Sequence, residues 1–182
     1  VNFYGAENHA KTKLPEGPGY RIHGMTPEYR VLEKLRPEEK KFAALREQGF
    51  TAANIVPDSG ILRGRSSLVS LTDGPVNEIV LRADALQHIA FEPRADVYPA
   101  SLMGVIAALR QTFYDAKHYR LDREHYLKNP LGRPRPPVDA GLEALQAVEA
   151  GQRVVIEPGS CLMVEQAAKL GKLFDFRFAL VA

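Results

Sequence analysis

The chain has 182 residues, of which 45% are hydrophobic and 25% are charged, close to the averages of globular proteins. Its formal net charge of +2 is too small to indicate nucleic-acid binding, and no basic run interleaves with aromatic residues. No apolar run approaches the roughly 18 residues that a membrane span needs. The single cysteine, Cys161, cannot form an internal disulfide, and no Cys/His ladder indicates structural zinc.

The first 36 residues show no sustained hydrophobic periodicity. They are rich in Gly, Pro, Asn and Lys, and only a short helical turn is expected near residues 27–35. We therefore expect residues 1–36 to form an irregular N-terminal segment and residues 37–182 to form one regular domain. Because the chain begins at Val1 and ends in a strand-like run, we expect both ends to be cuts through a longer chain or processed termini.

The regular domain begins with a helix that leads into a strand. Pro37 suits the first turn of a helix, and the two glutamates after it interact favourably with the helix dipole. Gly49 is typical of the position just after a helix. FTAANIV (50–56) then predicts a buried strand, closed by the turn residues PDSG (57–60). This order is typical of an α/β fold.

Residues 61–91 contain three strand-like runs. SSLVSLT (66–72) and NEIVLRA (77–83) are separated by the turn signal Asp-Gly-Pro, and together they predict a β-ribbon. QHIAF (87–91) predicts a separate, short buried strand. His88 lies inside this last run, where a packing role is the expected one for a lone histidine.

The longest apolar helix is expected within residues 91–119. Pro99 suits its first turn, and the mixed, charged sequence after Phe113 indicates a helix end that enters solvent. After residue 119 we expect a polar connection, because the prolines of NPLGRPRPP (129–137) exclude helix interior and central strand. Apolar side chains recur at helical spacing and form one wide stripe: Leu102, Val105, Ile106, Leu109 and Phe113.

Residues 139–181 alternate between helix and strand. Asp139 is expected to cap the first helix, and the second helix is expected to end at Gly171. The runs at 154–156 and 176–181 predict the two strands. Short connections in this order predict a parallel sheet.

Polar side chains follow the predicted strands at three places. In parallel α/β folds, the loops after the carboxyl ends of the strands carry the functional site. Asp58, Ser59 and Arg63 follow one strand and are candidate substrate-binding residues, although a plain turn is the favoured explanation for the first two. Glu92 and Glu157 are each the first polar residue after another strand.

The two glutamates are candidate metal ligands. In a barrel they would point into the same mouth, where carboxylates bind divalent metals or act as general acid and base. The alternative is that each accepts hydrogen bonds from a helix N-terminus and merely completes its strand. A proline follows both Glu92 and Glu157, which agrees with such a structural turn.

Three segments together resemble the metal-dependent amidohydrolase superfamily, namely its imidazolonepropionase-like and dihydroorotase-like members. YPASLMGVIAALRQTFYDAKHYR (98–120) is the most similar run. GFTAANIVPDSGILRGRSSLVSL (49–71) resembles the strand, loop and ribbon of that superfamily, and residues 154–181 resemble its later strand–helix–strand unit. The resemblance implies a fold class of α/β, as part of a TIM-like (β/α)8 barrel with a β-ribbon excursion.

The resemblance also implies an activity, in which one or two divalent metals, zinc or similar, activate water against a C–N bond. No His-x-His pair is found, and catalytic relatives usually carry a histidine where Glu157 stands. Glu92 aligns with a position where some relatives place a metal-bridging glutamate. We therefore expect no cofactor in this segment and a metal in the intact parent.

Two functions stay open at the level of sequence. One is hydrolysis of a cyclic amide or peptide-like bond by the intact parent; the other is a non-catalytic domain that binds a small molecule or a partner protein. About half a barrel fits in the chain, which would expose two open sheet edges. We therefore expect these edges to pack against the remainder of a longer chain or another copy. The compartment stays open, and a bacterial secreted or periplasmic location is the one that the resemblance suggests.

Overall fold

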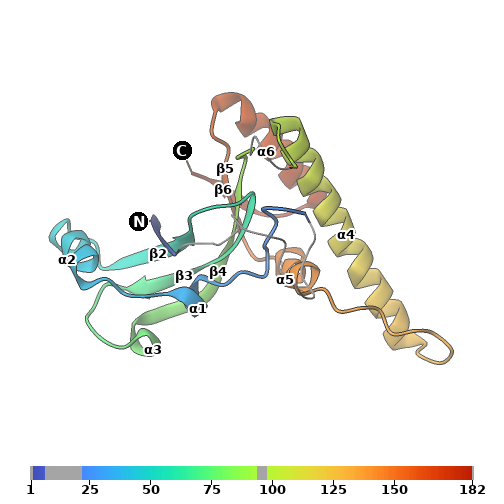
Figure 1. The fold of residues 1–182 in the computed structure, drawn as a ribbon, viewed down its shortest axis with the longest axis horizontal. Helices are drawn as coiled ribbons and strands as arrows, with labels where there is room; N and C mark the ends of the chain where they lie inside the picture. The colour runs from blue at the N-terminus through green and yellow to red at the C-terminus, as the bar shows by residue number, and fades with distance from the viewer. Residues whose placement is uncertain (1, 7–21, 94–97, 182) are drawn as a thin grey trace.

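The computed structural model describes residues 2–6, 22–93 and 98–181 and shows a mixed α/β fold. Six strands form one sheet in the order β1 to β6 (Figure 1). The sheet is antiparallel from β2 to β4 and parallel between β1 and β2 and from β4 to β6. The described strands form part of a sheet and do not show a closed barrel. Their bounds are β1 Asn2–Ala6, β2 Ala52–Pro57, β3 Leu62–Ser70, β4 Val80–Ala90, β5 Val154–Glu157 and β6 Phe178–Leu180.

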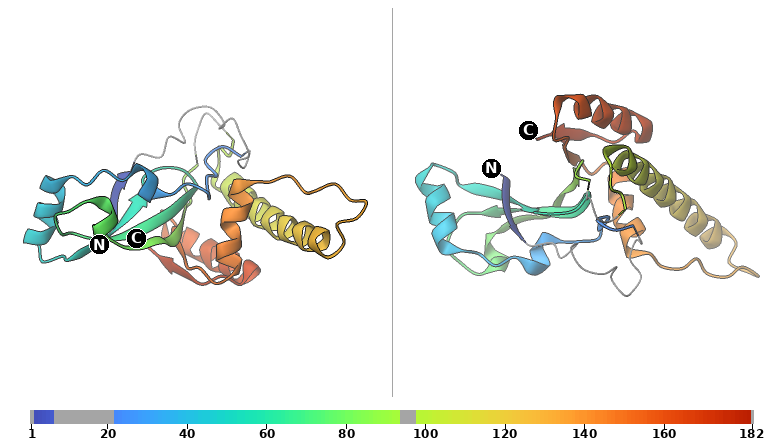
Figure 2. Two further views of the ribbon diagram at one scale, coloured as in Figure 1. Left: turned by 90° about the horizontal axis from the view of Figure 1, so that it is seen from below. Right: turned by 45° about the horizontal axis from the view of Figure 1, so that its top comes forward.

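The helices form two groups at opposite ends of the molecule, as both views in Figure 2 also show. Helices α1, α2 and α3 lie beside the antiparallel strands, and α4, α5 and α6 lie beside the parallel strands. No helix among the described residues is long and apolar enough to cross a membrane. The helix bounds are α1 Val31–Lys34, α2 Glu39–Glu47, α3 Val76–Ile79, α4 Leu102–Lys128, α5 Ala140–Glu149 and α6 Cys161–Phe174.

Each group of helices covers its own hydrophobic core. In the parallel half, Ile89 and Ile156 are paired across β4 and β5 and pack against α4, α5 and α6. Because side chains alternate along a strand, His88 and Glu157 lie on the opposite face of the sheet. In the antiparallel half, Ile55 belongs to a second core that includes Phe42 of α2. The predicted parallel arrangement is confirmed for β4, β5 and β6.

Helix α4 is longer than the sequence predicted. It begins after the N-cap Ser101, whose hydroxyl accepts a hydrogen bond from the Gly104 backbone, so Pro99 lies before the helix and not in its first turn. It continues through the charged residues to Lys128 instead of ending near residue 119. Ion pairs one turn apart stabilise this polar part, as Arg120 and Glu124 show. A polar sequence was therefore mistaken for a helix end.

Helix α6 also extends beyond its predicted end. Gly171 lies inside the helix, which continues to Phe174. Glycine is required at this position by close packing, because a Cβ atom on Gly171 would lie 2.5 Å from the ring of Phe178 on β6. This glycine serves the contact between helix and strand, and Asp175 in the left-handed conformation ends the helix.

Two further expectations for strands were wrong. The N-terminal segment contains strand β1, which pairs with β2 in parallel, so it is not wholly irregular. Most residues of the runs predicted at 77–83 and 87–91 lie in the single 11-residue strand β4, while residues 77–79 belong to the short helix α3 and Phe91 follows the strand. Strand β4 includes Asp84 with a positive φ and shows register shifts against β3. Short β-like runs interrupted by such irregular positions look separate in sequence. The β-ribbon itself is confirmed as the antiparallel pair β3 and β4.

Candidate functional site

Three of the predicted site residues meet at one edge of the sheet. Glu157 is the last residue of β5 and is paired with Ala90, the last residue of β4. Glu92 follows β4 two residues later, and Arg63 is the second residue of β3. The carboxyl ends of β4 and β5 and the beginning of β3 therefore bring these side chains together.

Arg63 joins the two glutamates directly. Its Nη1 donates to Glu157 Oε2 at 2.9 Å, and its Nη2 donates to Glu92 Oε2 at 3.2 Å. Its Nε donates to the Gly60 carbonyl oxygen at 3.1 Å. One guanidinium thus connects the ends of two parallel strands with the loop between β2 and β3. We call Arg63, Glu92 and Glu157 the Arg63 cluster.

The local sequence explains why Arg63 reaches these partners. The register between β3 and β4 shifts between Leu62 and Gly64, and an irregularity of this kind turns a side chain away from the regular alternation. Gly60 and Gly64 on either side both have positive φ. Gly64 also leaves room for the backbone of Tyr29, whose carbonyl oxygen accepts from the next amide of β3.

The three members of the Arg63 cluster differ in burial. The side chain of Arg63 is 7% exposed, that of Glu157 is 22% exposed, and that of Glu92 is 61% exposed. With both carboxylates ionised, the cluster carries one net negative charge. The contact with Glu157 is the shorter and better shielded of the two, so it dominates the stability of the cluster.

His88 lies on the same face of the sheet, two residues before the end of β4. It is 1% exposed, and neither ring nitrogen has a hydrogen-bond partner. Burial, and then the positive charge of Arg63, lower the pKa of His88 to about 4, so the ring is neutral at pH 7. The predicted buried packing position of His88 is confirmed, although its unpaired nitrogens are unusual for a buried polar ring.

Asp58 and Ser59 lie in the connection between β2 and β3. Asp58 is exposed and Ser59 is half-buried. Their role in substrate binding stays a prediction.

The Arg63 cluster does not fit a divalent metal while Arg63 contacts both carboxylates. Each carboxylate directs one oxygen to a guanidinium that is already positively charged and close to both. Among the described residues, no three His, Cys, Asp or Glu side chains form a group that could hold a metal ion. A metal role for Glu92 and Glu157 stays a prediction, and it would require Arg63 to leave its place.

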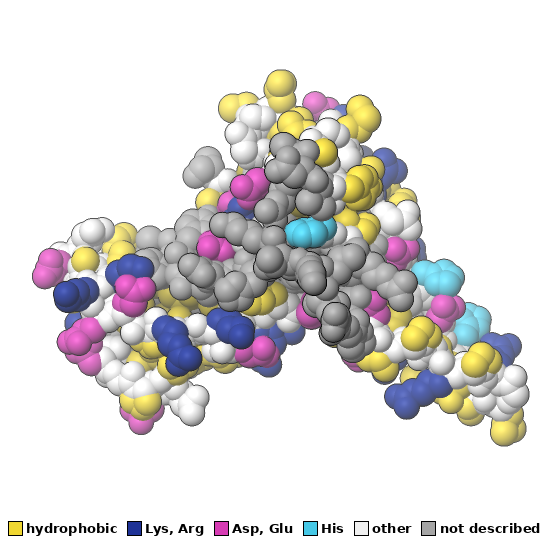
Figure 3. Space-filling view, viewed as in Figure 1, with side chains coloured by type: hydrophobic (Ala, Val, Ile, Leu, Met, Phe, Trp, Pro, Cys, Tyr) yellow, Lys and Arg dark blue, Asp and Glu magenta, His cyan; other side chains and the backbone are white. Residues whose placement is uncertain are grey.

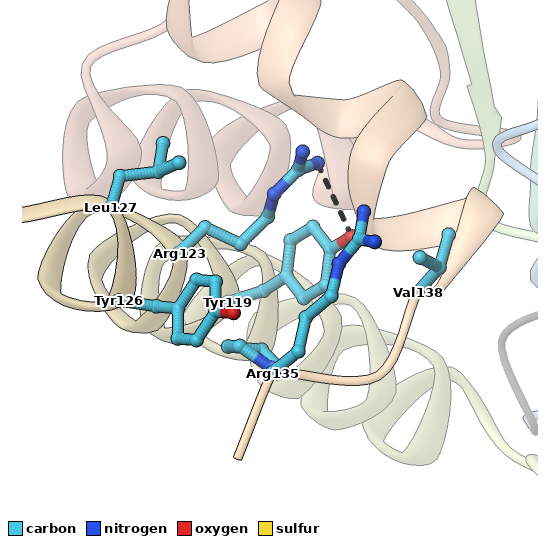
Figure 4. A pocket seen from close by; sticks show the side chains of 7 residues that line it. Tyr119, Arg123, Tyr126, Leu127, Arg135 and Val138 are labelled. Atoms are coloured by element: carbon cyan, nitrogen blue, oxygen red, sulfur yellow. Dashed lines mark hydrogen bonds between the residues drawn. The ribbon is translucent and has the colours of Figure 1, made fainter. Parts of the chain in front are cut away.

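A concave region lies between the end of α4 and the chain that returns to α5 (Figure 4). It has a volume of about 170 Å³, and the Arg123 guanidinium lies 5.6 Å from the Tyr119 ring centroid. Arg123 also donates to the Tyr119 hydroxyl at 3.5 Å and pairs with Glu143 at 2.7 Å. Figure 3 shows apolar and basic side chains side by side over this part of the molecule. The lining residues are Tyr119, Arg123, Tyr126, Leu127, Arg135, Pro136 and Val138.

Sequence reasoning missed the link between the candidates. The sequence predicts substrate binding for Arg63 and metal binding for the two glutamates, whereas the structure brings all three into one ion-paired group. A signal was present, because an arginine between two glycines follows a strand that ends at the same edge. The sequence could not predict which residues pair with Arg63, because Glu92 is 29 residues and Glu157 is 94 residues away along the chain.

Similarity to one solved structure supports the fold. No family model matches the chain, and no curated protein matches it. A crystal structure of an amidohydrolase from Thermotoga maritima MSB8 is similar, with a TM-score of 0.78 and 20% sequence identity. The match covers 86% of this chain and 43% of that structure, so the chain spans less than half of its length. The likeness shows an amidohydrolase-like fold.

Proposed function

We propose that this chain forms part of an amidohydrolase-type hydrolase, and that the complete protein cleaves a C–N bond in a cyclic amide or peptide-like substrate. The observation that carries the proposal is the meeting of Arg63, Glu92 and Glu157 at the carboxyl ends of β4 and β5. Sites of α/β barrels lie at this edge. The amidohydrolase-like fold agrees with the proposal, but fold alone does not assign a reaction.

Within this proposal the members of the Arg63 cluster have different tasks. Glu92 is the exposed member and can exchange a proton with a bound substrate as a general acid or base. Arg63 is fixed by Glu157 and by the Gly60 carbonyl, so it positions the Glu92 carboxylate. A divalent metal such as zinc, if the complete protein uses one, would activate the attacking water and be held by residues outside this cluster.

A second function, a non-catalytic domain that binds a small molecule or a partner protein, is favoured by one specific observation. Arg63 already pairs with both candidate carboxylates, which leaves them less free for proton transfer or metal binding. A barrel-like domain with such an internally paired site can retain the fold after loss of the reaction.

The experiment is a hydrolysis assay on the complete protein with cyclic amides, N-acyl amino acids and dipeptides, with and without added zinc or manganese. Under the hydrolase proposal, E92Q lowers kcat for at least one substrate by about 10²-fold or more, the range expected for loss of a general acid or base. R120Q is the matched control, because Arg120 also pairs with two glutamates but lies on α4. No turnover on any substrate, together with saturable binding of one of them, would favour the non-catalytic function.

A further inference from the structure

The resemblance to metal-dependent hydrolases implies a cation where carboxylates from neighbouring strand ends meet. In this chain the position between Glu92 and Glu157 is already filled by a cationic side chain. We propose that the guanidinium of Arg63 is a resident cation, which joins the ends of β4 and β5 in place of a metal ion.

Contact geometry supports a fixed position for Arg63. All three kinds of guanidinium nitrogen have an acceptor: Nη1 reaches Glu157, Nη2 reaches Glu92, and Nε reaches the Gly60 carbonyl. The side chain is 7% exposed, so water competes little for these donors. A planar guanidinium with donors in a fixed fork is suited to hold two carboxylates at once.

Charge supports the same inference. Two carboxylates that are both in contact with one guanidinium would repel each other in its absence. Arg63 provides this cation permanently, whereas a metal ion must be taken from solution. A divalent ion added beside Arg63 would meet a positive charge already hydrogen-bonded to both carboxylates.

Topology gives the cation a structural task. Glu157 ends β5, Glu92 follows β4, and Gly60 precedes β3, so the three acceptors belong to three different segments of the chain. A cation that contacts all three closes this edge of the sheet. The inference concerns the same site as the proposed function, but it does not depend on turnover, because its readouts are metal binding and thermal unfolding.

The first experiment measures Mn²⁺ binding to the complete protein by electron paramagnetic resonance, for the wild type and for E92Q/E157Q. We expect equal Mn²⁺ stoichiometries, because any metal elsewhere in the protein is unaffected by these substitutions. Loss of a stoichiometric Mn²⁺ in E92Q/E157Q would overturn the proposal. This comparison needs no variant of Arg63 and therefore remains decisive if such variants fold poorly.

The second experiment replaces the cation by Arg63→Met, which retains much of the apolar stem. We expect Tm to fall by roughly 5–10 °C, as expected for breaking a shielded ion pair in a chain of this size. We also expect R63M to bind one additional Mn²⁺, which restores part of the lost Tm. The triple variant R63M/E92Q/E157Q should show neither the additional Mn²⁺ nor the restoration.

The outcomes separate this inference from the proposed function. An unchanged Tm in R63M, or a lower Tm that Mn²⁺ does not raise, would overturn the resident-cation role. Loss of hydrolysis alone would bear on the proposed function and not on this role. R63K serves as a charge-retaining comparison, and it should bind no additional Mn²⁺ even if its single ammonium group holds the carboxylates less well.

Discussion

Two arginines of this protein each pair with two glutamates, but in different surroundings. Arg63 contacts Glu92 and Glu157 at 3.2 and 2.9 Å, whereas Arg120 on α4 contacts Glu124 and Glu149, each at 2.6 Å. The shorter contacts belong to Arg120, yet its side chain is 39% exposed and that of Arg63 only 7%. Solvent screens charges at the surface, so the longer contacts of Arg63 should contribute more to stability.

We expect burial, more than distance, to determine how much these ion pairs contribute to stability. It also separates two uses of the same residue types. Arg120 supports a helix against its neighbour α5 through exposed pairs, while Arg63 links distant segments at the edge where a functional site is expected. Three measurements test this contrast between the two arginines, and a fourth tests the effect of burial on His88.

The largest effect is expected for R63M compared with R120M. Removal of Arg63 leaves Glu157 partly buried without its cation and should lower the free energy of unfolding by about 3 kcal/mol. The free energy of unfolding of R120M should equal that of the wild type within experimental error, because the ion pairs of Arg120 are accessible to water. Urea unfolding of both variants measures the difference. Equal losses in the two variants would contradict the role of burial.

A large effect is also expected from His88 as the pH falls. The folded protein holds the pKa of His88 near 4, below the value of 6.5 for the free side chain, so the unfolded chain binds the proton first. The contribution of neutral His88 to the free energy of unfolding is therefore fully present above about pH 6.5. It declines as the pH falls toward 4, by at most about 3 kcal/mol. H88Q removes the titrating group and should flatten this slope between pH 6.5 and 4.5. An unchanged slope in H88Q would contradict the assignment.

A moderate effect is expected when the two glutamates of the cluster are compared. E157Q removes the shielded, shorter contact to Arg63, whereas E92Q removes the contact whose carboxylate is 61% exposed. We expect E157Q to lower Tm by several degrees more than E92Q. Differential scanning calorimetry at low and high salt measures this, and added salt should reduce only the small contribution of Glu92. A larger decrease of Tm in E92Q than in E157Q would contradict the expectation that the more buried contact contributes more.

The smallest effect is expected for the exposed ion pair between Arg120 on α4 and Glu149 on α5. A double-mutant cycle on Arg120 and Glu149 should give a coupling close to the detection limit, in agreement with other exposed pairs. The same cycle on Arg63 and Glu157 should give a clearly larger coupling. If the two couplings agree, the contrast between the two arginines has no energetic basis.

Sequence patterns predicted the parts of this fold that depend on local signals. The cap at Asp139, the turn at Gly49 and the parallel strands after β4 follow from neighbouring residues, and the structure confirms them. The predictions were wrong where tertiary contacts determine the ends of the helices. Gly171 looked like a helix end but serves a contact with Phe178, and charged residues after Phe113 continue α4 through ion pairs.

The same distinction applies to the candidate site. The rule that polar residues follow buried strands identified Arg63, Glu92 and Glu157, and the structure brings these three together. Their mutual pairing was not predictable, because no local pattern relates Arg63 at the beginning of β3 to a strand that begins 91 residues later. The unpaired nitrogens of His88 likewise depend on which side chains surround it and not on its own segment.

The sequence separations within the Arg63 cluster have a consequence for the order of folding. Contacts among β2, β3 and β4 join nearby residues, whereas the bond to Glu157 closes a loop of 94 residues. Short loops close with a smaller loss of chain entropy, so we expect the antiparallel strands to form first. During synthesis, Arg63 would emerge long before its more buried partner. The bond between Arg63 and Glu157 would therefore form only after the C-terminal half has packed against the antiparallel strands.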